Sequence, residues 1–266
     1  MVSIMTFDQR FHSLQDFLAS TVADVDGVLN DGGGFPFPVK GRELNATVLF
    51  ADISGFSTRT LGMTPAETLV YVQNFFAWIT AEALHGRPGI VDKYIGDEVM
   101  VVFSEEFGSA DPFGDAIQAA IAMGQHDVHA YRPHIGVASG PVIVGYAGTA
   151  LRYDVSVFGA PVALAARCAA VKPDPTTTGY VSSTIVAPES DWTGRPLSDF
   201  YQPDIPGDER FRLLEAREVP MKGIGDVSVR ELHNTGLWAP TMSAEARARL
   251  GMETLREANR YWPRTS

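Results

Sequence analysis

Residues 44–57 read LNATVLFADISGFS, and residues 93–103 read KYIGDEVMVVF. In the first stretch an apolar run ends at Asp52, which predicts a strand over 44–51 with a carboxylate at the rim of a sheet. The second stretch belongs to a predicted hairpin over 89–103, whose turn contains Asp97. Two such carboxylates on neighbouring strands suit Mg²⁺ or Mn²⁺, and two ions can act together on a phosphate ester.

A second interpretation fits the same two residues without any ligand. Asp52 can cap the turn that follows its strand, and Asp97 can accept a hydrogen bond within its own turn. The two aspartates alone do not decide between these interpretations.

The remaining pattern alternates strands and helices. We expect a β-α-β-β-α-β-β-α order followed by further strands to about residue 237. The first predicted helix spans 64–83, with Thr64 as its cap and proline at its first position. The later predicted elements are a helix over 112–125, strands over 134–139 and 142–146 that meet at Gly140-Pro141, and a helix over 160–170.

Two segments flank this pattern. Apolar residues at helical spacing over 7–29 predict a helix that either covers the core or mediates dimerisation, and the spacing leaves both open. Residues 243–261 have the pattern of a charged amphipathic helix. We therefore expect an N-terminal helix and linker over 1–40, a catalytic domain over 41–237 and a helical tail over 238–266.

Composition restricts the class of protein. The 266 residues are 45% hydrophobic and 20% charged, with a formal net charge of −11, so a folded domain is expected that binds neither nucleic acid nor an anionic membrane. No apolar run is long enough to span a bilayer. Cys168 is the single cysteine, which favours a reducing, cytoplasmic location.

Five motifs resemble those of the class III nucleotidyl cyclases, in the same order. They cover about residues 43–233. Stretches 50–57 and 93–103 resemble the two metal motifs, and IGVASGPVIVGYAG (135–148) resembles the glycine-rich segment that follows. GAPVALAAR (159–167) resembles the start of the catalytic helix, and MKGI (221–224) the late lysine-glycine turn. The resemblance implies an α/β fold with a palm-like β-α-β-β-α-β core and a mostly antiparallel central sheet.

The resemblance also implies a head-to-tail homodimer with each active site between subunits. Two divalent ions, Mn²⁺ or Mg²⁺, would be held by one subunit and the substrate by both. The implied roles are metal binding for Asp52, Asp97 and the Ile53 carbonyl, base contact for Lys93 and Ser156, stabilisation of the reacting phosphate for Arg167, and binding of the terminal phosphates for Lys222. Phe50 shares a strand face with Asp52 and could support the sugar or base, or simply belong to the core.

One position departs from the family pattern. Ala163 stands where relatives carry an asparagine that orients the ribose. With the apparent lack of a sensor domain, this resembles the pyrimidine cyclases of Pycsar anti-phage defence, which implies UTP as substrate and an effector switched on by cyclic UMP. The rival interpretations are an adenylate cyclase, an inactive nucleotide sensor with the same cleft, and a scaffold whose terminal helices recruit partners.

Overall fold

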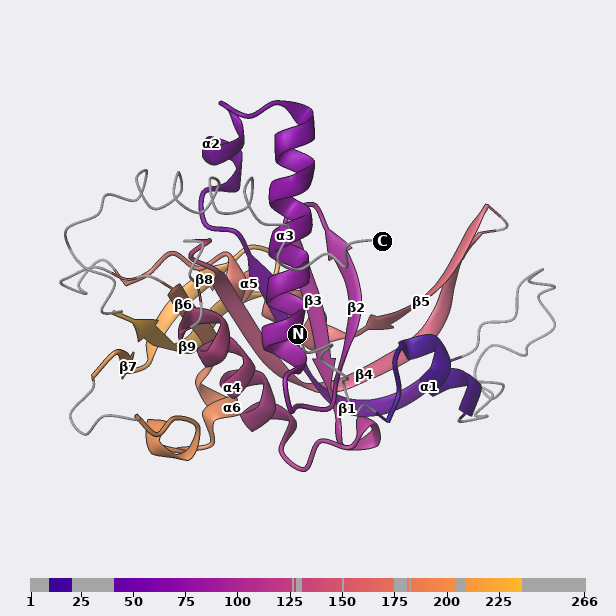
Figure 1. Cartoon of the computed structure of the whole chain (residues 1–266). Coiled ribbons are helices and arrows are strands. Elements are labelled where there is room, and N and C mark those ends of the chain that lie inside the picture. The colour runs from indigo at the N-terminus through magenta and orange to yellow at the C-terminus, as the bar shows by residue number, and fades with distance from the viewer. Residues whose placement is uncertain are drawn as a thin grey trace, which may run out of the picture.

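The structure is a computed structural model that describes residues 10–20, 41–125, 127, 131–149, 151–174, 181, 183–203 and 209–235. Its described residues form a nine-stranded sheet (Figure 1). Seven of the strands follow the order β2-β3-β1-β4-β6-β9-β7, and the other two, β5 and β8, pair with β4 and β9. The strands are β1 (Gly41–Asp52), β2 (Gly89–Ile95), β3 (Glu98–Phe103), β4 (His134–Thr149), β5 (Arg152–Phe158), β6 (Ser183–Pro188), β7 (Phe211–Leu213), β8 (Arg217–Met221) and β9 (Gly225–Asn234). Only β4 and β6 pair in parallel, so the predicted mostly antiparallel α/β fold is confirmed.

Helices cover both faces of this sheet. They are α1 (Leu14–Ser20), α2 (Phe56–Thr60), α3 (Pro65–Leu84), α4 (Pro112–Gln125), α5 (Ala160–Ala169) and α6 (Glu189–Trp192), with 3-10 turns η1 (Glu105–Phe107) and η2 (Leu197–Asp199). Along β1, Leu49 and Ala51 pack toward α3 and α4, whereas Val48 and Phe50 pack toward α1 and α5. This alternation is the period of two that a strand imposes on its side chains.

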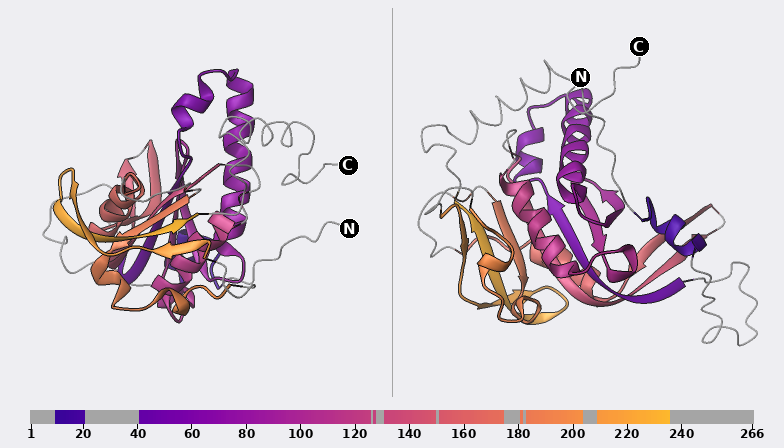
Figure 2. Two further views of the ribbon diagram at one scale, coloured as in Figure 1. Left: turned by 90° about the vertical axis from the view of Figure 1, so that its left-hand side faces the viewer. Right: turned by 60° about the horizontal axis from the view of Figure 1, so that its bottom comes forward.

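Helix α3 begins as its sequence predicts. The Thr64 amide donates to a Glu67 carboxylate oxygen at 2.9 Å, and the Glu67 amide donates to the Thr64 hydroxyl at 3.3 Å. This capping box, followed by Pro65, satisfies amides at the start of the helix. Helix α2 precedes α3 and was not predicted. Both turned views in Figure 2 show α2 and the start of α3 rising beyond the sheet.

The predicted turn at Gly140-Pro141 is wrong. Strand β4 runs through both residues and pairs with β1 continuously from His134 to Gly145. On its other edge, β6 pairs only with residues 134–136 and β5 only with residues 143–149. Pro141 therefore lies where no further strand adjoins that edge, and its missing N–H leaves no ladder bond unmade there. The two predicted strands, 134–139 and 142–146, are therefore parts of the single strand β4.

Helix α5 lies very close to β4 because of Gly136. A Cβ atom on Gly136 would lie 2.0 Å from the carbonyl oxygen of Ala165 and 2.2 Å from the amide nitrogen of Ala169. Only a residue without a side chain permits this contact. Gly136 therefore fixes the distance between the sheet and the helix that carries Arg167.

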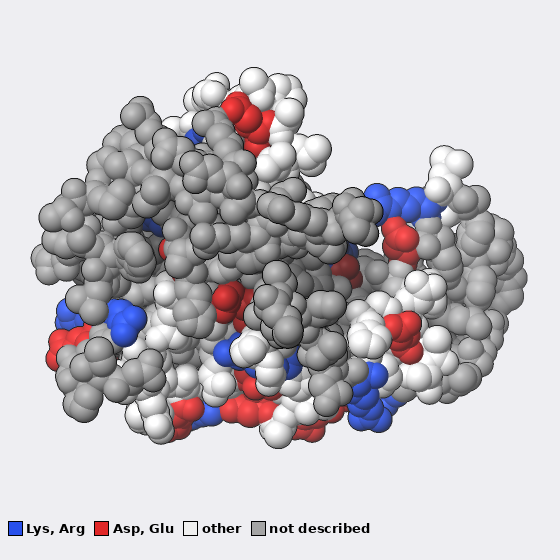
Figure 3. All heavy atoms as spheres, viewed as in Figure 1, with Lys and Arg blue, Asp and Glu red and all other residues white. Residues whose placement is uncertain are grey.

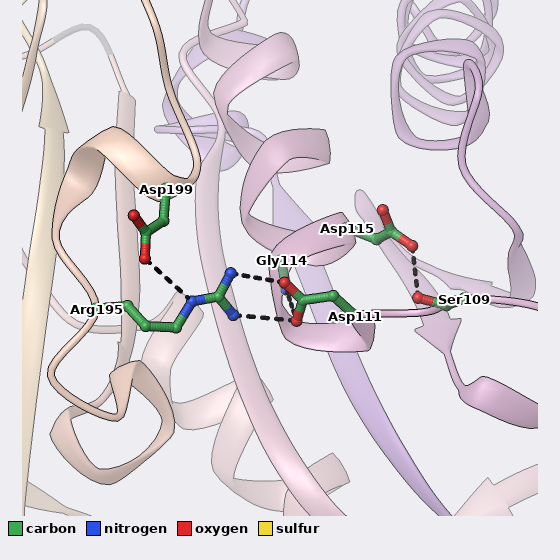
Figure 4. Close-up of polar contacts among 6 residues, drawn as sticks. All are labelled: Ser109, Asp111, Gly114, Asp115, Arg195 and Asp199. Carbon is green, nitrogen blue, oxygen red and sulfur yellow. Dashed lines mark hydrogen bonds and ion pairs between the residues drawn. The ribbon is translucent and has the colours of Figure 1, made fainter.

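The segment after β6 is tied to α4 by one arginine. Arg195 donates to both carboxylate oxygens of Asp111, at 3.1 and 2.6 Å, and its guanidinium lies 3.7 Å from Asp199 (Figure 4). The same guanidinium stacks 4.3 Å from the centre of the Phe200 ring.

Over the described part of the face in Figure 3, basic and acidic side chains lie beside one another.

The structure describes only part of the two helices predicted at the ends of the chain. Helix α1 lies within the predicted 7–29 helix, and its Leu14 and Phe17 are buried on the α5 side of the sheet. Residues 21–40 and the predicted tail helix over 243–261 lie outside the described residues. The choice between a core helix and a dimerisation helix over 7–29 stays open, although the described turns of α1 do cover the core.

Candidate active site

The ends of β1 and the β2–β3 turn bring two carboxylates together. Asp52 is the last residue of β1 and pairs across the ladder with Glu98, the first residue of β3. Asp97 precedes Glu98 in a turn that Gly96 makes possible with a φ of 64°. The Asp97 side chain is close enough to Asp52 to act on it and to raise its pKa. The predicted proximity of the two aspartates is therefore present in the structure.

The surroundings of Asp52 favour its protonated form. Burial raises the pKa of Asp52 to about 8, helped by the hydrogen bond with Asp97 and by the charges of Asp97 and Glu98, while the Ile53 amide opposes the rise. Burial and then Asp97 also raise the pKa of Glu98. Within the described chain, no lysine or arginine is among the groups that act on Asp52. A nearby positive charge would favour the ionised form of Asp52 and lower this pKa.

The backbone beside Asp52 offers a further oxygen. The Ile53 side chain is 1% exposed and anchors the chain in the core. Its carbonyl accepts one hydrogen bond, from the Phe56 amide at 3.2 Å. A carbonyl oxygen has two lone pairs, so one remains for a ligand. Together the two carboxylates and this carbonyl are the hard oxygen donors that Mg²⁺ and Mn²⁺ take.

A second cluster lies on β2 and β5. Lys93 donates to the Ser156 hydroxyl, and this hydroxyl donates to an Asp92 carboxylate oxygen at 2.9 Å. The Lys93 ammonium is 3.3 Å from the same oxygen. The structure thus joins the two predicted base-contacting residues within one protomer. Asp92 was missed, because alternation along a regular strand places it on the face opposite Lys93.

The cluster lies in an open pocket of about 450 Å³. Asp92, Lys93 and Ser156 line one side, and Ser13 to Gln15 from the start of α1 line another. Phe50, Met100 and Lys93 are register partners across β1, β3 and β2. Phe50 is 3% exposed and packs in the core beneath this face, so its contact with a substrate stays a prediction.

The phosphate-binding residues predicted from the sequence lie elsewhere on the protomer. Arg167 and Ala163 are both exposed and one turn apart on α5. Lys222 is exposed in the β8–β9 turn. Its neighbour Met221 packs in the same cluster as Cys168, the neighbour of Arg167. Neither the Arg167 nor the Lys222 side chain has a hydrogen bond or ion pair within the described ranges.

The comparison with known families decides what this arrangement is. The family described as "Adenylate and Guanylate cyclase catalytic domain" matches residues 39–175, just over half of the 266 residues. The chain belongs to this family. The matched part of the cyclase domain contains the two aspartates and Lys93, Ser156 and Arg167, whereas Lys222 and helix α1 lie outside it.

The relatives agree with this assignment at the level of the fold. An uncharacterised Mycobacterium tuberculosis protein, Rv1319c, is 30% identical over 151 residues, which are 55% of this chain and 28% of the relative. The chain thus matches under a third of that relative's length. The adenylyl cyclase CyaB from P. aeruginosa has a TM-score of 0.56 at 21% identity, covering 73% of this chain and 95% of its own. The guanylate cyclase domain of RhGC from Catenaria anguillulae, solved with GTP, gives 0.56 at 18% identity, with 73% and 100% covered.

These structural neighbours act on different nucleotides, so the shared fold does not give the base that this cyclase domain takes. None of the helices in the described ranges combines the length and the apolar character needed to cross a bilayer.

Proposed function

We propose that this cyclase domain converts a nucleoside triphosphate into a 3′,5′-cyclic nucleotide and pyrophosphate. The observation that carries the proposal is the Asp52–Asp97 pair, which is placed by β1 and the β2–β3 turn and in which burial, Asp97 and Glu98 raise the pKa of Asp52. Cyclases of this class generally use two divalent metal ions. The donor atoms of Asp52, Asp97 and the Ile53 carbonyl fit such ions.

The reaction forms one bond and breaks one. The ribose O3′ attacks the α-phosphorus and loses its proton, and the bond between the α-phosphorus and the bridging oxygen breaks to release pyrophosphate. Two bound divalent ions, Mn²⁺ in our proposal and Mg²⁺ as the alternative, would favour the ionised 3′-hydroxyl and stabilise the leaving group. Arg167 would neutralise the charge that develops on the reacting phosphate, since its planar fork matches phosphate oxygens. Lys222 would hold the terminal phosphates.

Each site is proposed to lie between two copies of the chain. Among the described residues no cation acts on Asp52, whereas Arg167 and Lys222 are exposed cations. A head-to-tail homodimer would place the cations of one copy against the carboxylates of the other. The lysine and serine of the second cluster would then contact the base of the same nucleotide.

UTP is the proposed substrate, and the cyclic UMP made from it would activate a separate effector in anti-phage defence. Support comes from Ala163, which removes the usual ribose-orienting amide, and from the resemblance to Pycsar cyclases. ATP is the second candidate, because Ser156 can act as threonine does in relatives that take ATP. All four bases offer an acceptor beside a donor, so the donor and acceptor groups of Lys93 and Ser156 do not by themselves identify the base; the choice would depend on which of the two is held as donor, which as acceptor, and where each lies in the pocket.

A competition among nucleotides tests this proposal. Purified protein with Mn²⁺ and equal ATP, GTP, CTP and UTP should yield mainly cyclic UMP, resolved by mass. A dominant cyclic AMP peak would keep the reaction and replace the substrate. Binding of nucleotide without any cyclic product would instead indicate an inactive sensor.

Subunit mixing tests the shared site. Asp52→Ala and Arg167→Ala should each abolish product formation while both proteins remain dimeric. Mixed and allowed to exchange subunits, the two should recover up to about a quarter of wild-type activity. About half of the dimers are then mixed, and each mixed dimer has one of its two sites intact. No recovery despite proven exchange would place both residues in a site within one subunit.

A further inference from the structure

Asp92 has an unusual place in β2. The ladder between β2 and β3 pairs Val91 with Val101 and Lys93 with Met100, which leaves Asp92 as the extra residue of a bulge. A bulge allows two successive side chains to turn toward the same side. The Asp92 side chain is 0% exposed, whereas the Lys93 side chain beside it is 39% exposed. A buried carboxylate thus supports a lysine that reaches into the pocket.

The hydrogen bonds of this cluster can be assigned. Ser156 has one hydroxyl proton, which it donates to Asp92. The Ser156 oxygen therefore acts only as an acceptor toward the pocket, where it already accepts from Lys93. Lys93 has three donors, of which one faces Ser156 and one faces Asp92. One Lys93 donor and one Ser156 lone pair remain for a ligand.

Without the carboxylate, this assignment is lost. The Ser156 hydroxyl could then rotate and present its proton to the pocket, and Lys93 would lose the charge that holds its ammonium beside β5. The pocket would display two donors in place of a donor and an acceptor. A base is read by the order of its donors and acceptors, so this change alters which base fits.

We propose that Asp92 is a positioning residue that sets base selectivity, by fixing Lys93 as the donor and Ser156 as the acceptor in this pocket. The proposal rests on the proposed function, because it takes the pocket as the site of the nucleotide base. Asp92 itself does not touch the substrate. It differs from a purely structural link between β2 and β5, which would affect all nucleotides equally.

The test compares Asp92→Asn with Asp191→Asn. Asp191 is a matched control because it is another carboxylate that is largely withdrawn from solvent and accepts a hydrogen bond, at 2.7 Å from the Ser139 amide, but it does not line the pocket. The measurements are kcat and KM for each of the four nucleoside triphosphates, with thermal midpoint and dimer mass as controls for folding.

For Asp92→Asn we expect KM for the preferred nucleotide to rise about tenfold, and its preference over the next best to fall by a similar factor, with kcat within about threefold. Asp191→Asn should leave the preference unchanged even if it lowers the thermal midpoint. An equal loss for all four nucleotides in Asp92→Asn, with the preference kept, would overturn the proposal.

Two further measurements keep the test decisive. Ser156→Ala should reproduce the loss of preference, and adding Asp92→Asn to it should cause a smaller loss than Asp92→Asn causes alone, because Asp92 acts partly through the Ser156 hydroxyl. The proposal is refuted if the losses in the double variant are fully additive. If Asp92→Asn fails to fold, an unchanged base preference in Ser156→Ala refutes the proposal instead. Calorimetry with 3′-deoxynucleoside triphosphates, which cannot cyclise, separates the two proposals: lost base preference in binding supports the role of Asp92 even if the wild-type protein forms no cyclic product.

Discussion

Replacing Asp52 with asparagine is expected to stabilise the metal-free protein above neutral pH. Burial and the neighbouring carboxylates raise the pKa of Asp52 from 3.8 to about 8. A carboxyl with a higher pKa in the folded than in the unfolded chain keeps a proton that the unfolded chain releases. The free energy of unfolding therefore falls as the pH rises from about 4 to about 8. Asparagine has the same shape and does not ionise, so it removes this loss.

The size of the effect follows from the shift. A difference of about 4 pKa units corresponds to at most about 5–6 kcal/mol, at 1.36 kcal/mol per unit. Asp52 is only partly buried, so solvent screening reduces this value substantially. We expect Asp52→Asn to gain about 1–3 kcal/mol at pH 8 and less than about 1 kcal/mol at pH 4.5.

Urea unfolding at both pH values in EDTA measures the gain. Asp154→Asn is the control, because Asp154 is exposed and bonded to Arg152 at 2.6 Å, and its substitution should not change the difference between the two pH values. Mn²⁺ should then stabilise the wild-type protein but not Asp52→Asn, since only the former keeps the metal-binding pair. If Asp52→Asn gains nothing at pH 8, or if Mn²⁺ stabilises both equally, the inferred acidic metal site is wrong.

Three further outcomes follow from the packing. Gly136→Ala should lower the free energy of unfolding by about 1–3 kcal/mol, because its Cβ meets the backbone of α5, whereas Gly62→Ala, with open space around it, should not. Cys168 is fully buried with a pKa raised to about 12, so it should resist thiol reagents at pH 8 until urea unfolds the chain. Arg195→Ala should cost about 0.5–1 kcal/mol in urea unfolding after solvent screening, and Arg195→Lys should not restore the paired bonds to Asp111.

The elements that the sequence predicts well are those encoded by neighbouring residues. The Thr64 cap and the hairpin around Gly96 depend on contacts within a few positions, and both were predicted from them. Gly140-Pro141 has the composition of a turn, yet it lies within β4, because the long pairing with β1 outweighs a local preference. Which strands adjoin an edge is a property of the whole sheet, and no local pattern contains it.

In the candidate site, too, some residues could be predicted from local motifs, whereas others depend on the arrangement of the whole sheet. Motifs located Asp52 and Asp97, and the strands then brought them into contact. Asp92 was missed because its position depends on a bulge, which shifts the alternation by one residue and has no fixed composition. The lining of the pocket by Ser13 to Gln15 was missed too, since it joins segments about 80 residues apart in the sequence.

The distribution of charge within one protomer explains why metal binding and dimerisation should be linked. The chain has a net charge of −11, and the pKa of Asp52 at the end of β1 is raised by burial and by Asp97 and Glu98, with no cation of the described chain acting on it. Arg167, in contrast, is exposed on α5 and has no ion-pair partner among the residues that the structure describes. In the proposed homodimer, the nucleotide phosphates would lie between these two groups, with metal ions on one side and arginine on the other. Each copy alone would leave both groups uncompensated, so metal and triphosphate together should tighten the dimer, and neither should do so alone.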